Sequence, residues 1–183
     1  MRYEIIELNG LQVIGIAREI AFKDGPTECP KFWAEEYVEK IVKPVIMEGN
    51  EPNELQKAAF ENNVGEFGLC TCKYPGHNCI TCGADNFGAC STKTFTYVIG
   101  GTYKGGNVPE GMKLFSVPNG RWLKMHFEGG MPKFQEQYAM FYEIWIKEHP
   151  EFKFATDGCV IEWYDGNDIE SPDYKCGIMM PIE

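Results

Sequence analysis

Positive charge is scarce in this sequence. Its 183 residues hold 17 Lys and Arg against 27 Asp and Glu, so the formal net charge is −10 at pH 7. The phosphate backbone of a nucleic acid repels such a chain unless basic residues gather in a patch. The sequence has no such basic patch, so we expect no direct nucleic-acid partner.

Long apolar runs are also missing. No stretch approaches the ~18 apolar residues that a membrane span needs. The first residues, Met1-Arg2-Tyr3-Glu4, lack the apolar run of a signal peptide. These absences predict a cytoplasmic protein without a membrane partner. Because thiols stay reduced in the cytoplasm, the eight cysteines are not expected to form a disulfide framework.

The motifs of several large enzyme classes are absent too: the phosphate loop, the dinucleotide-type glycine fingerprint and the serine nucleophile elbow. What is present is a repeated order of elements. The order strand, helix, strand, strand occurs in residues 3–19, 32–41, 64–69 and 94–99, and again in 114–127, 133–147, 158–164 and 174–180. Antiparallel strand pairs with one crossover helix per half predict an α+β fold.

We therefore expect a single domain, residues 1–183, made of two βαββ pseudo-repeats, 1–110 and 111–183, with a cysteine-rich loop insertion at 70–90. Two such halves meeting about a pseudo-twofold axis would leave a groove between them. Small molecules often bind in grooves at such seams.

Turn-forming residues interrupt this pattern. Asn9-Gly10 predicts a turn within the first strand segment. Gly25-Pro26 and Cys29-Pro30 predict a loop before the first helix, and Pro44 predicts a kink or a stop in it. Residues 48–63 predict a polar surface excursion.

Short motifs follow the same order along the chain. In the second half they are Ser116-Val117-Pro118-Asn119-Gly120-Arg121-Trp122, Phe127-Glu128-Gly129-Gly130, Phe141-Tyr142-Glu143-Ile144-Trp145, Val160-Ile161-Glu162-Trp163-Tyr164 and Met180-Pro181-Ile182. In the first half they are Pro30-Lys31-Phe32-Trp33, Val64-Gly65-Glu66-Phe67-Gly68-Leu69-Cys70 and Phe95-Thr96-Tyr97-Val98-Ile99-Gly100. Together they resemble the GyrI-like family, also called the effector-binding domain of AraC-type and multidrug-binding regulators.

The resemblance implies a duplicated βαββ unit of the SHS2 type, with a concave antiparallel sheet and two main helices. It also implies a small-molecule partner, with flat apolar or cationic ligands sensed or sequestered in an aromatic pocket. Many family members carry a helix-turn-helix domain. This sequence starts directly at the ligand-binding fold, so we expect a standalone member.

Glu162 is the first candidate binding residue. It alternates with Ile161 and Trp163, so it faces the same side of its strand as Tyr164. The family resemblance implies that a glutamate at this position points into the pocket, where it can pair with a cation. The alternative is a solvated outer face of the sheet.

Aromatic residues form the second candidate group. The predicted ligand contacts besides Glu162 are Trp33, Tyr37, Phe67, Tyr97, Trp122, Tyr142 and Trp145. We expect about half of them to touch a ligand and the others to fill the core.

The third group is a cysteine cluster. Cys70, Cys72, Cys79 and Cys82 have a spacing that suits a tetrahedral structural zinc ion. Free thiols are the main alternative. The family pattern does not include this loop, so the resemblance lends the zinc hypothesis no support.

Two other functions stay open. Some standalone relatives hydrolyse reactive cyclopropane-bearing compounds, and here Glu162 would act as the base and Tyr142 as an acid. Other relatives inhibit DNA gyrase, which would make this chain an interaction module with a protein partner.

Overall fold

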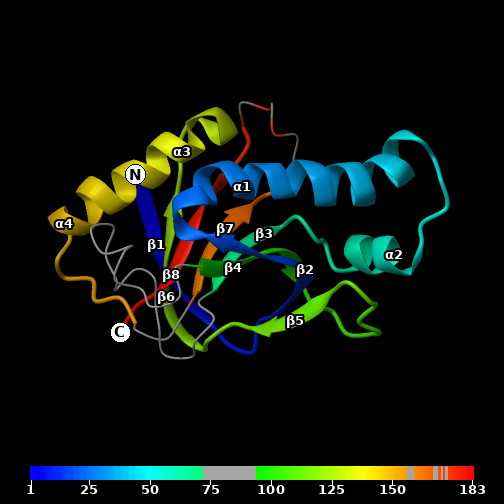
Figure 1. Ribbon diagram of the computed structural model, residues 1–183. Coiled ribbons are helices and arrows are strands. Elements are labelled where there is room, and N and C mark those ends of the chain that lie inside the picture. Colours follow the sequence, from blue (N-terminus) through cyan, green and yellow to red (C-terminus); the bar gives the residue numbers. More distant parts are fainter. Residues whose placement is uncertain (72–93, 156–158, 167–168, 170, 172) are drawn as a thin grey trace.

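The computed structural model describes residues 1–71, 94–155, 159–166, 169, 171 and 173–183. Within these residues, eight antiparallel strands form one sheet, and two long helical segments lie on one of its faces (Figure 1). The strands are β1 (Arg2–Leu8), β2 (Gln12–Ala21), β3 (Phe67–Thr71), β4 (Thr94–Thr102), β5 (Lys113–Ser116), β6 (Gly120–His126), β7 (Cys159–Tyr164) and β8 (Cys176–Pro181). The helices are η1 (Phe22–Asp24), α1 (Gly25–Phe32), η2 (Trp33–Met47), α2 (Glu54–Glu61), α3 (Gly130–Met140), η4 (Phe141–Trp145) and α4 (Ile146–Glu148). This is the α+β fold with two main helices that the sequence predicts.

The sheet is symmetric about its centre. Its strand order is β1-β6-β8-β7-β3-β4-β2-β5. The unit β2-helix-β3-β4 therefore has the same order as the unit β6-helix-β7-β8 and lies on the other side of the sheet centre. The two units join where β3 pairs with β7, from Phe67 opposite Trp163 to Thr71 opposite Cys159. The seam between the halves thus runs along two central strands.

The two edge strands are exchanged between the halves. β1 leads into β2 along the chain, yet it pairs with β6, and β5 leads into β6, yet it pairs with β2. Two glycines with positive φ accompany this crossing: Gly10 in the first connection, and Gly120 as the first residue of β6 after the second. The two connections touch, because the Gly10 N–H donates to Asn119 Oδ1 at 2.7 Å. The Asn9-Gly10 turn therefore separates two strands that do not pair with each other.

The first helix begins earlier than the sequence predicts. Residues 25–32 are helical, so the loop predicted at Gly25-Pro26 and Cys29-Pro30 is wrong. Pro26 is tolerated because the first helical turn needs no N–H donor from it. The helix then widens into the π-helical η2 segment and continues beyond Pro44 to Met47. Pro44 does not stop the helix, which ends three residues later.

The predicted polar excursion holds a short helix of its own, α2. Asn53 caps it, because the Asn53 Oδ1 accepts from the Gln56 N–H at 2.9 Å and Gln56 Oε1 accepts from the Asn53 N–H at 2.9 Å. Gln56 also donates to the Lys40 carbonyl at 2.9 Å, which ties α2 to η2. This reciprocal capping satisfies helix donors that would otherwise have no partner.

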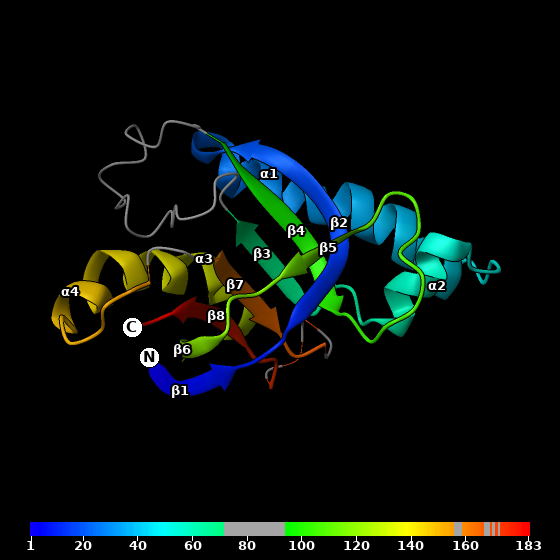
Figure 2. The same ribbon diagram turned by 90° about the horizontal axis from the view of Figure 1, so that it is seen from below.

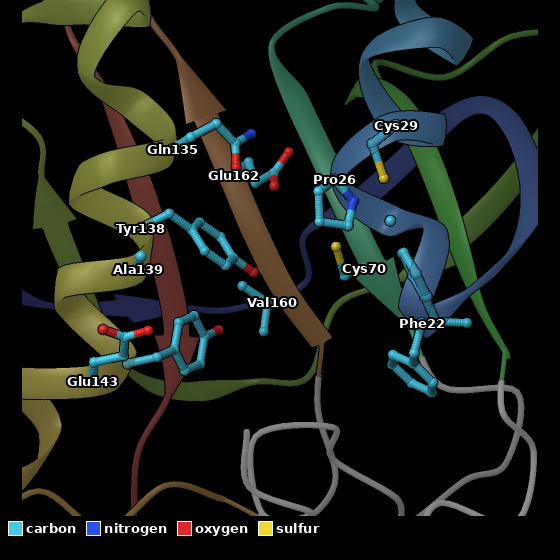
Figure 3. A pocket seen from close by; sticks show the side chains of 13 residues that line it. Phe22, Pro26, Cys29, Cys70, Gln135, Tyr138, Ala139, Glu143, Val160 and Glu162 are labelled. Atoms are coloured by element: carbon cyan, nitrogen blue, oxygen red, sulfur yellow. The ribbon is translucent and has the colours of Figure 1, made fainter. Parts of the chain in front are cut away.

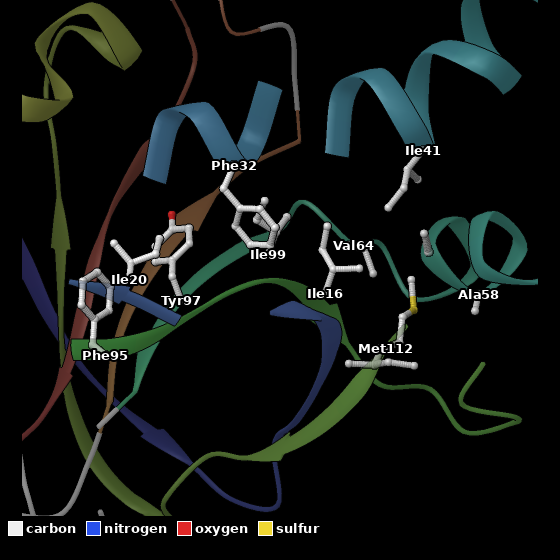
Figure 4. Packing of buried hydrophobic residues seen from close by; sticks show 12 residues of the cluster. Ile16, Ile20, Phe32, Ile41, Ala58, Val64, Phe95, Tyr97, Ile99 and Met112 are labelled. Atoms are coloured by element: carbon white, nitrogen blue, oxygen red, sulfur yellow. The ribbon is translucent and has the colours of Figure 1, made fainter. Parts of the chain in front are cut away.

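Side chains from alternate strand positions build separate cores on the two faces of the sheet. On the helix side, one cluster packs β2 and β4 against the first helix, with Tyr97 and Ile99 beneath Phe32 (Figure 4). A second cluster packs β6 and β8 against α3 and η4, around Phe134 and Phe141. Cys70 contacts both clusters, so it marks their boundary.

A third cluster fills the face turned away from the helices. It joins Leu69, Trp122 and Ile161 with the edge residues Ile6 and Phe115. This face therefore carries one apolar layer that reaches from one edge of the sheet to the other. Figure 2 shows the curvature of β2. Among the described residues, every helix is too short or too polar to cross a bilayer.

Candidate functional site

A pocket of about 320 Å³ lies at the seam, between α1 and α3 and above β3 and β7 (Figure 3). It is lined by Phe22, Gly25, Pro26, Cys29, Cys70, Phe95, Gln135, Tyr138, Ala139, Tyr142, Glu143, Val160 and Glu162. Phe95 and Val160 are buried at its base, whereas Gln135 and Glu143 are exposed at its rim. Both halves of the chain therefore build its wall.

Strand alternation decides which side chains reach the pocket. On β7, Val160 and Glu162 face the helices, whereas Ile161 and Trp163 belong to the cluster on the opposite face. Cys70 of β3 lines the pocket beside them. The carboxyl group of Glu162 points into the space between α1 and α3 (Figure 3).

Two tyrosines hold the Glu162 carboxyl group. The Tyr97 hydroxyl donates to Glu162 Oε2 at 2.5 Å, and the Tyr164 hydroxyl donates to the same oxygen at 2.9 Å. Trp33 Nε1 in turn donates to the Tyr97 hydroxyl at 2.9 Å. In the described part of the chain, both hydrogen bonds to Glu162 end on Oε2, which leaves Oε1 for a ligand.

Gly68 makes this arrangement possible. β3 lies between β4, which carries Tyr97, and β7, which carries Glu162. A Cβ atom at Gly68 would collide with both Glu162 Oε2 and the Tyr97 hydroxyl. Only a residue without a side chain lets the two groups meet across the intervening strand.

Burial governs the ionisation of the site. Burial raises the pKa of Glu162, and the hydrogen bonds from Tyr97 and Tyr164 offset part of that rise. The pKa values of Tyr97 and Tyr164 lie well above 10.0, first because of burial and then because of the Glu162 charge. Burial also raises the pKa of Cys29 to about 12. These hydroxyl and thiol groups therefore stay protonated around Glu162.

No lysine, arginine or histidine belongs to the described lining of the pocket, which holds two carboxyl groups, Glu162 and Glu143. A negative group that lacks a protein counter-charge in a partly desolvated site attracts a cation more strongly than it would in water. The charge of the lining thus favours a positive ligand.

The predicted ligand contacts divide into three groups. Glu162 and Tyr142 line the pocket. Tyr97, Trp33 and Tyr37 lie behind it: Tyr97 holds Glu162, and the Trp33 ring packs edge-on against Tyr37 at 5.3 Å between centroids. The second group therefore supports the carboxyl group from inside the first core cluster.

The remaining three predicted contacts do not line this pocket. Phe67 and Trp122 belong to the cluster on the opposite face of the sheet. Trp145 stacks on Phe141 at 5.3 Å and on His149 at 3.9 Å between ring centroids, within the second core cluster. The rings of these three residues pack in apolar clusters instead.

The sequence interpretation missed several wall residues. Phe22 and Phe95 stack on each other at 5.2 Å between centroids, and Tyr138 packs against Tyr142 at 5.0 Å. Tyr138 precedes Tyr142 by one helical turn, a spacing that places both rings on one helix face and could have revealed it. Pro26 and Cys29 were missed because their segment was expected to be a loop.

Most of the predicted zinc ligands lie outside the residues that the structure describes. Cys72, Cys79 and Cys82 lie outside the described part of the chain, as does most of the 70–90 insertion. Cys70 is described, and its side chain lines the pocket. The described residues contain no group of three side chains that could hold a metal ion. A structural zinc in this loop stays a prediction.

Comparisons with known proteins agree with the fold. The family model of the GyrI-like small molecule binding domain matches residues 1–183. A structure of SAV2435 bound to tetraphenylphosphonium is 17% identical, with a TM-score of 0.68, over 100% of this chain and 94% of that chain. A putative bacterial transcription regulation protein from Staphylococcus aureus MU50 is 18% identical, with a TM-score of 0.65, over 100% and 99%.

An integron cassette protein from Vibrio cholerae is 17% identical, with a TM-score of 0.55, over 99% of this chain and 95% of that chain. At such identities the structural likeness shows a shared fold. The comparison with curated proteins gave no significant match.

Proposed function

The chain belongs to the GyrI-like small molecule binding domain family, and from this premise we propose that it binds apolar organic cations in the pocket between α1 and α3. Glu162 is the charge partner, and the surrounding rings are the apolar wall. The observation that carries the proposal is a half-buried carboxyl group inside an aromatic pocket whose described lining holds no basic side chain.

The wall suits such a ligand. Phe22, Phe95, Tyr138 and Tyr142 supply ring surfaces, and aromatic faces attract cations that have lost part of their hydration. A volume of about 320 Å³ lies at the lower end of the range of small-molecule pockets. SAV2435, which shares the fold, has been observed with tetraphenylphosphonium bound. That cation is therefore a suitable probe for this chain.

Titration of the full chain with tetraphenylphosphonium tests the proposal. We expect saturable binding that weakens at least about tenfold in Glu162→Gln, because the variant keeps an acceptor for Tyr97 and Tyr164 but loses the charge. The matched control is Glu110→Gln, which removes the same charge from an exposed loop position outside the pocket lining and should bind as the parent does.

A neutral ligand of similar shape, triphenylphosphine oxide, separates charge from shape. Its affinity should differ little between the parent and Glu162→Gln. If the substitution weakens the neutral and the cationic ligand equally, Glu162 does not act as a charge partner. If tetraphenylphosphonium fails to bind the parent, the proposal is wrong.

Hydrolysis of a reactive cyclopropane-bearing compound is the second candidate, and the hydroxyl groups around Glu162 favour it. A carboxyl group with a raised pKa is suited to activate water near neutral pH. Its hydroxyl partners are Tyr97 and Tyr164, whereas the sequence interpretation assigned the acid role to Tyr142. Incubation with such an electrophile tests this: turnover that survives in Glu162→Gln would contradict it.

A further inference from the structure

We propose that the pocket exchanges a proton for its cation, so that Glu162 carries a proton when the pocket is empty and releases it to solvent when an organic cation binds. This inference rests on the proposed function, because it concerns the same site. It goes further because it assigns a coupled ion to the binding reaction.

The hydrogen bonds around Glu162 fit both forms of the carboxyl group. In the protonated form, Oε2 is the carbonyl oxygen, which can accept from both Tyr97 and Tyr164 as observed. The proton then sits on Oε1. In the ionised form, the same two donors hold Oε2 through stronger, charge-assisted bonds. The carboxyl group can therefore lose its proton without any rearrangement of its partners.

The proton and the cation would occupy the same side of the carboxyl group. Tyr97 and Tyr164 approach Oε2, and the Trp33 indole donates to the Tyr97 hydroxyl, so these donors come from behind the pocket. Glu162 itself lines the pocket. A ligand that approaches Oε1 meets the proton if it is present, so the two positive groups compete for one oxygen.

The groups that face Glu162 cannot replace either ion. They are Cys29 of α1, Cys70 of β3, Tyr97 of β4, Tyr138 of α3, Tyr142 and Glu143 of η4, and Tyr164 of β7. None of these described groups is a base that could carry a permanent positive charge. Arg18, which lies opposite Tyr97 on β2, pairs with Glu36 at 3.2 Å and with Glu35 at 3.8 Å. Among the described residues, the pocket thus offers no basic partner for an ionised Glu162, and burial raises the pKa of its carboxyl group.

The exchange balances without a further reactant. The O–H bond of the Glu162 carboxyl group breaks, its electron pair stays on the carboxylate, and the proton passes to water or buffer. The organic cation then neutralises the carboxylate without forming a covalent bond. Linkage requires that the affinity for the cation fall by about tenfold per pH unit below the pKa of Glu162 and become constant above it.

Calorimetric titration of the full chain with tetraphenylphosphonium tests the exchange. Titrations in two buffers that differ in ionisation enthalpy and both buffer at the pH in question (acetate and MES at the acid end, phosphate and Tris at the neutral end) are compared at several values between about pH 5 and about pH 8. The parent should release a fraction of a proton per cation that approaches one at the acid end and decreases as the pH rises. Glu110→Gln should do the same, whereas Glu162→Gln should bind more weakly and release none.

Two failures are distinguishable. If tetraphenylphosphonium binds the parent with the same affinity across this pH range and with no dependence on the buffer, the exchange is wrong but the cation site stands. If the cation does not bind the parent at any pH, the proposed function is wrong, and the exchange with it.

Discussion

The two faces of the central strands β3 and β7 have different roles: one packs into an apolar cluster and the other borders a pocket. On the face turned away from the helices, Leu69 and Ile161 are buried at 1% and 0% exposure in a continuous apolar cluster. On the helix face, the neighbouring positions are Gly68, which has no side chain, and Glu162, which is ionisable and lines the pocket. One face of the central strands thus contributes to stability through close packing. The other face is less closely packed, because the proposed function needs space and charge there.

The pocket that the described residues form on the helix face lies at the seam. Away from it, each half fills the space under its own helix with large side chains such as Ile99 or Phe141. Where the halves meet, α1 and α3 stand on either side of the pocket (Figure 3). Residues of both halves therefore line a site that neither half forms alone.

The largest expected effect on this comparison comes from the face turned away from the helices. Ile161→Ala should lower the free energy of unfolding by about 2–5 kcal/mol, because it opens a cavity in a fully buried cluster. Chemical denaturation measures the loss. The folded fraction should keep its affinity for tetraphenylphosphonium. A large loss of affinity at full folding would show that the two faces are not independent.

A smaller loss of stability is expected when Gly68 on the pocket face is given a side chain. Gly68→Ala places a methyl group against Glu162 Oε2 and the Tyr97 hydroxyl, and overpacking of this kind costs about 1–3 kcal/mol. It should also weaken cation binding, because Glu162 loses its position. The double variant Gly68→Ala with Tyr97→Phe removes one of the two colliding atoms and should recover part of the stability. No recovery would contradict the assigned role of Gly68.

The next substitution is expected to raise stability rather than lower it. Glu162 has a folded-state pKa above its ordinary value of 4.5, so its contribution to stability is present below that value and is lost as pH rises through the folded pKa. Glu162→Gln cannot ionise and should therefore become progressively more stable than the parent as pH increases. Melting temperatures measured across this range check the trend. A parent that gains stability over the variant with rising pH would contradict it.

The smallest effects are expected from single aromatic substitutions, one away from the pocket and one in its wall. Trp145→Phe keeps a ring in the second core cluster, away from the pocket lining, and should leave the affinity for tetraphenylphosphonium unchanged. Tyr138→Leu removes a ring from the pocket wall and should weaken binding by about 0.5–2 kcal/mol. Equal affinities for these two variants would place the ligand elsewhere.

Local patterns in the sequence predict part of this site. The alternation of Ile161, Glu162 and Trp163 is enough to place Glu162 on the same face as Tyr164, and the two are hydrogen-bonded. Alternation does not say which face turns to the helices, so it could not show that the predicted contacts Phe67 and Trp122 belong to the cluster on the opposite face.

Non-local contacts account for what the sequence did not reveal. The role of Gly68 depends on β3 lying between β4 and β7, and the exchange of β1 and β5 depends on partners from the other half. Neither relation leaves a pattern along the chain. The helical residues around Pro26 and Pro30 were hidden for a different reason, since proline usually interrupts helices. Here Pro26 lies in the first helical turn, which tolerates it, whereas Pro30 lies inside the helix.

A crystal structure of the complex with tetraphenylphosphonium is the most direct test of the cation site. The account predicts the phosphonium between α1 and α3, with Glu162 Oε1 facing it and Tyr97 and Tyr164 still bonded to Oε2. A cation bound at any other surface, with Glu162 still turned toward an empty pocket, would contradict it.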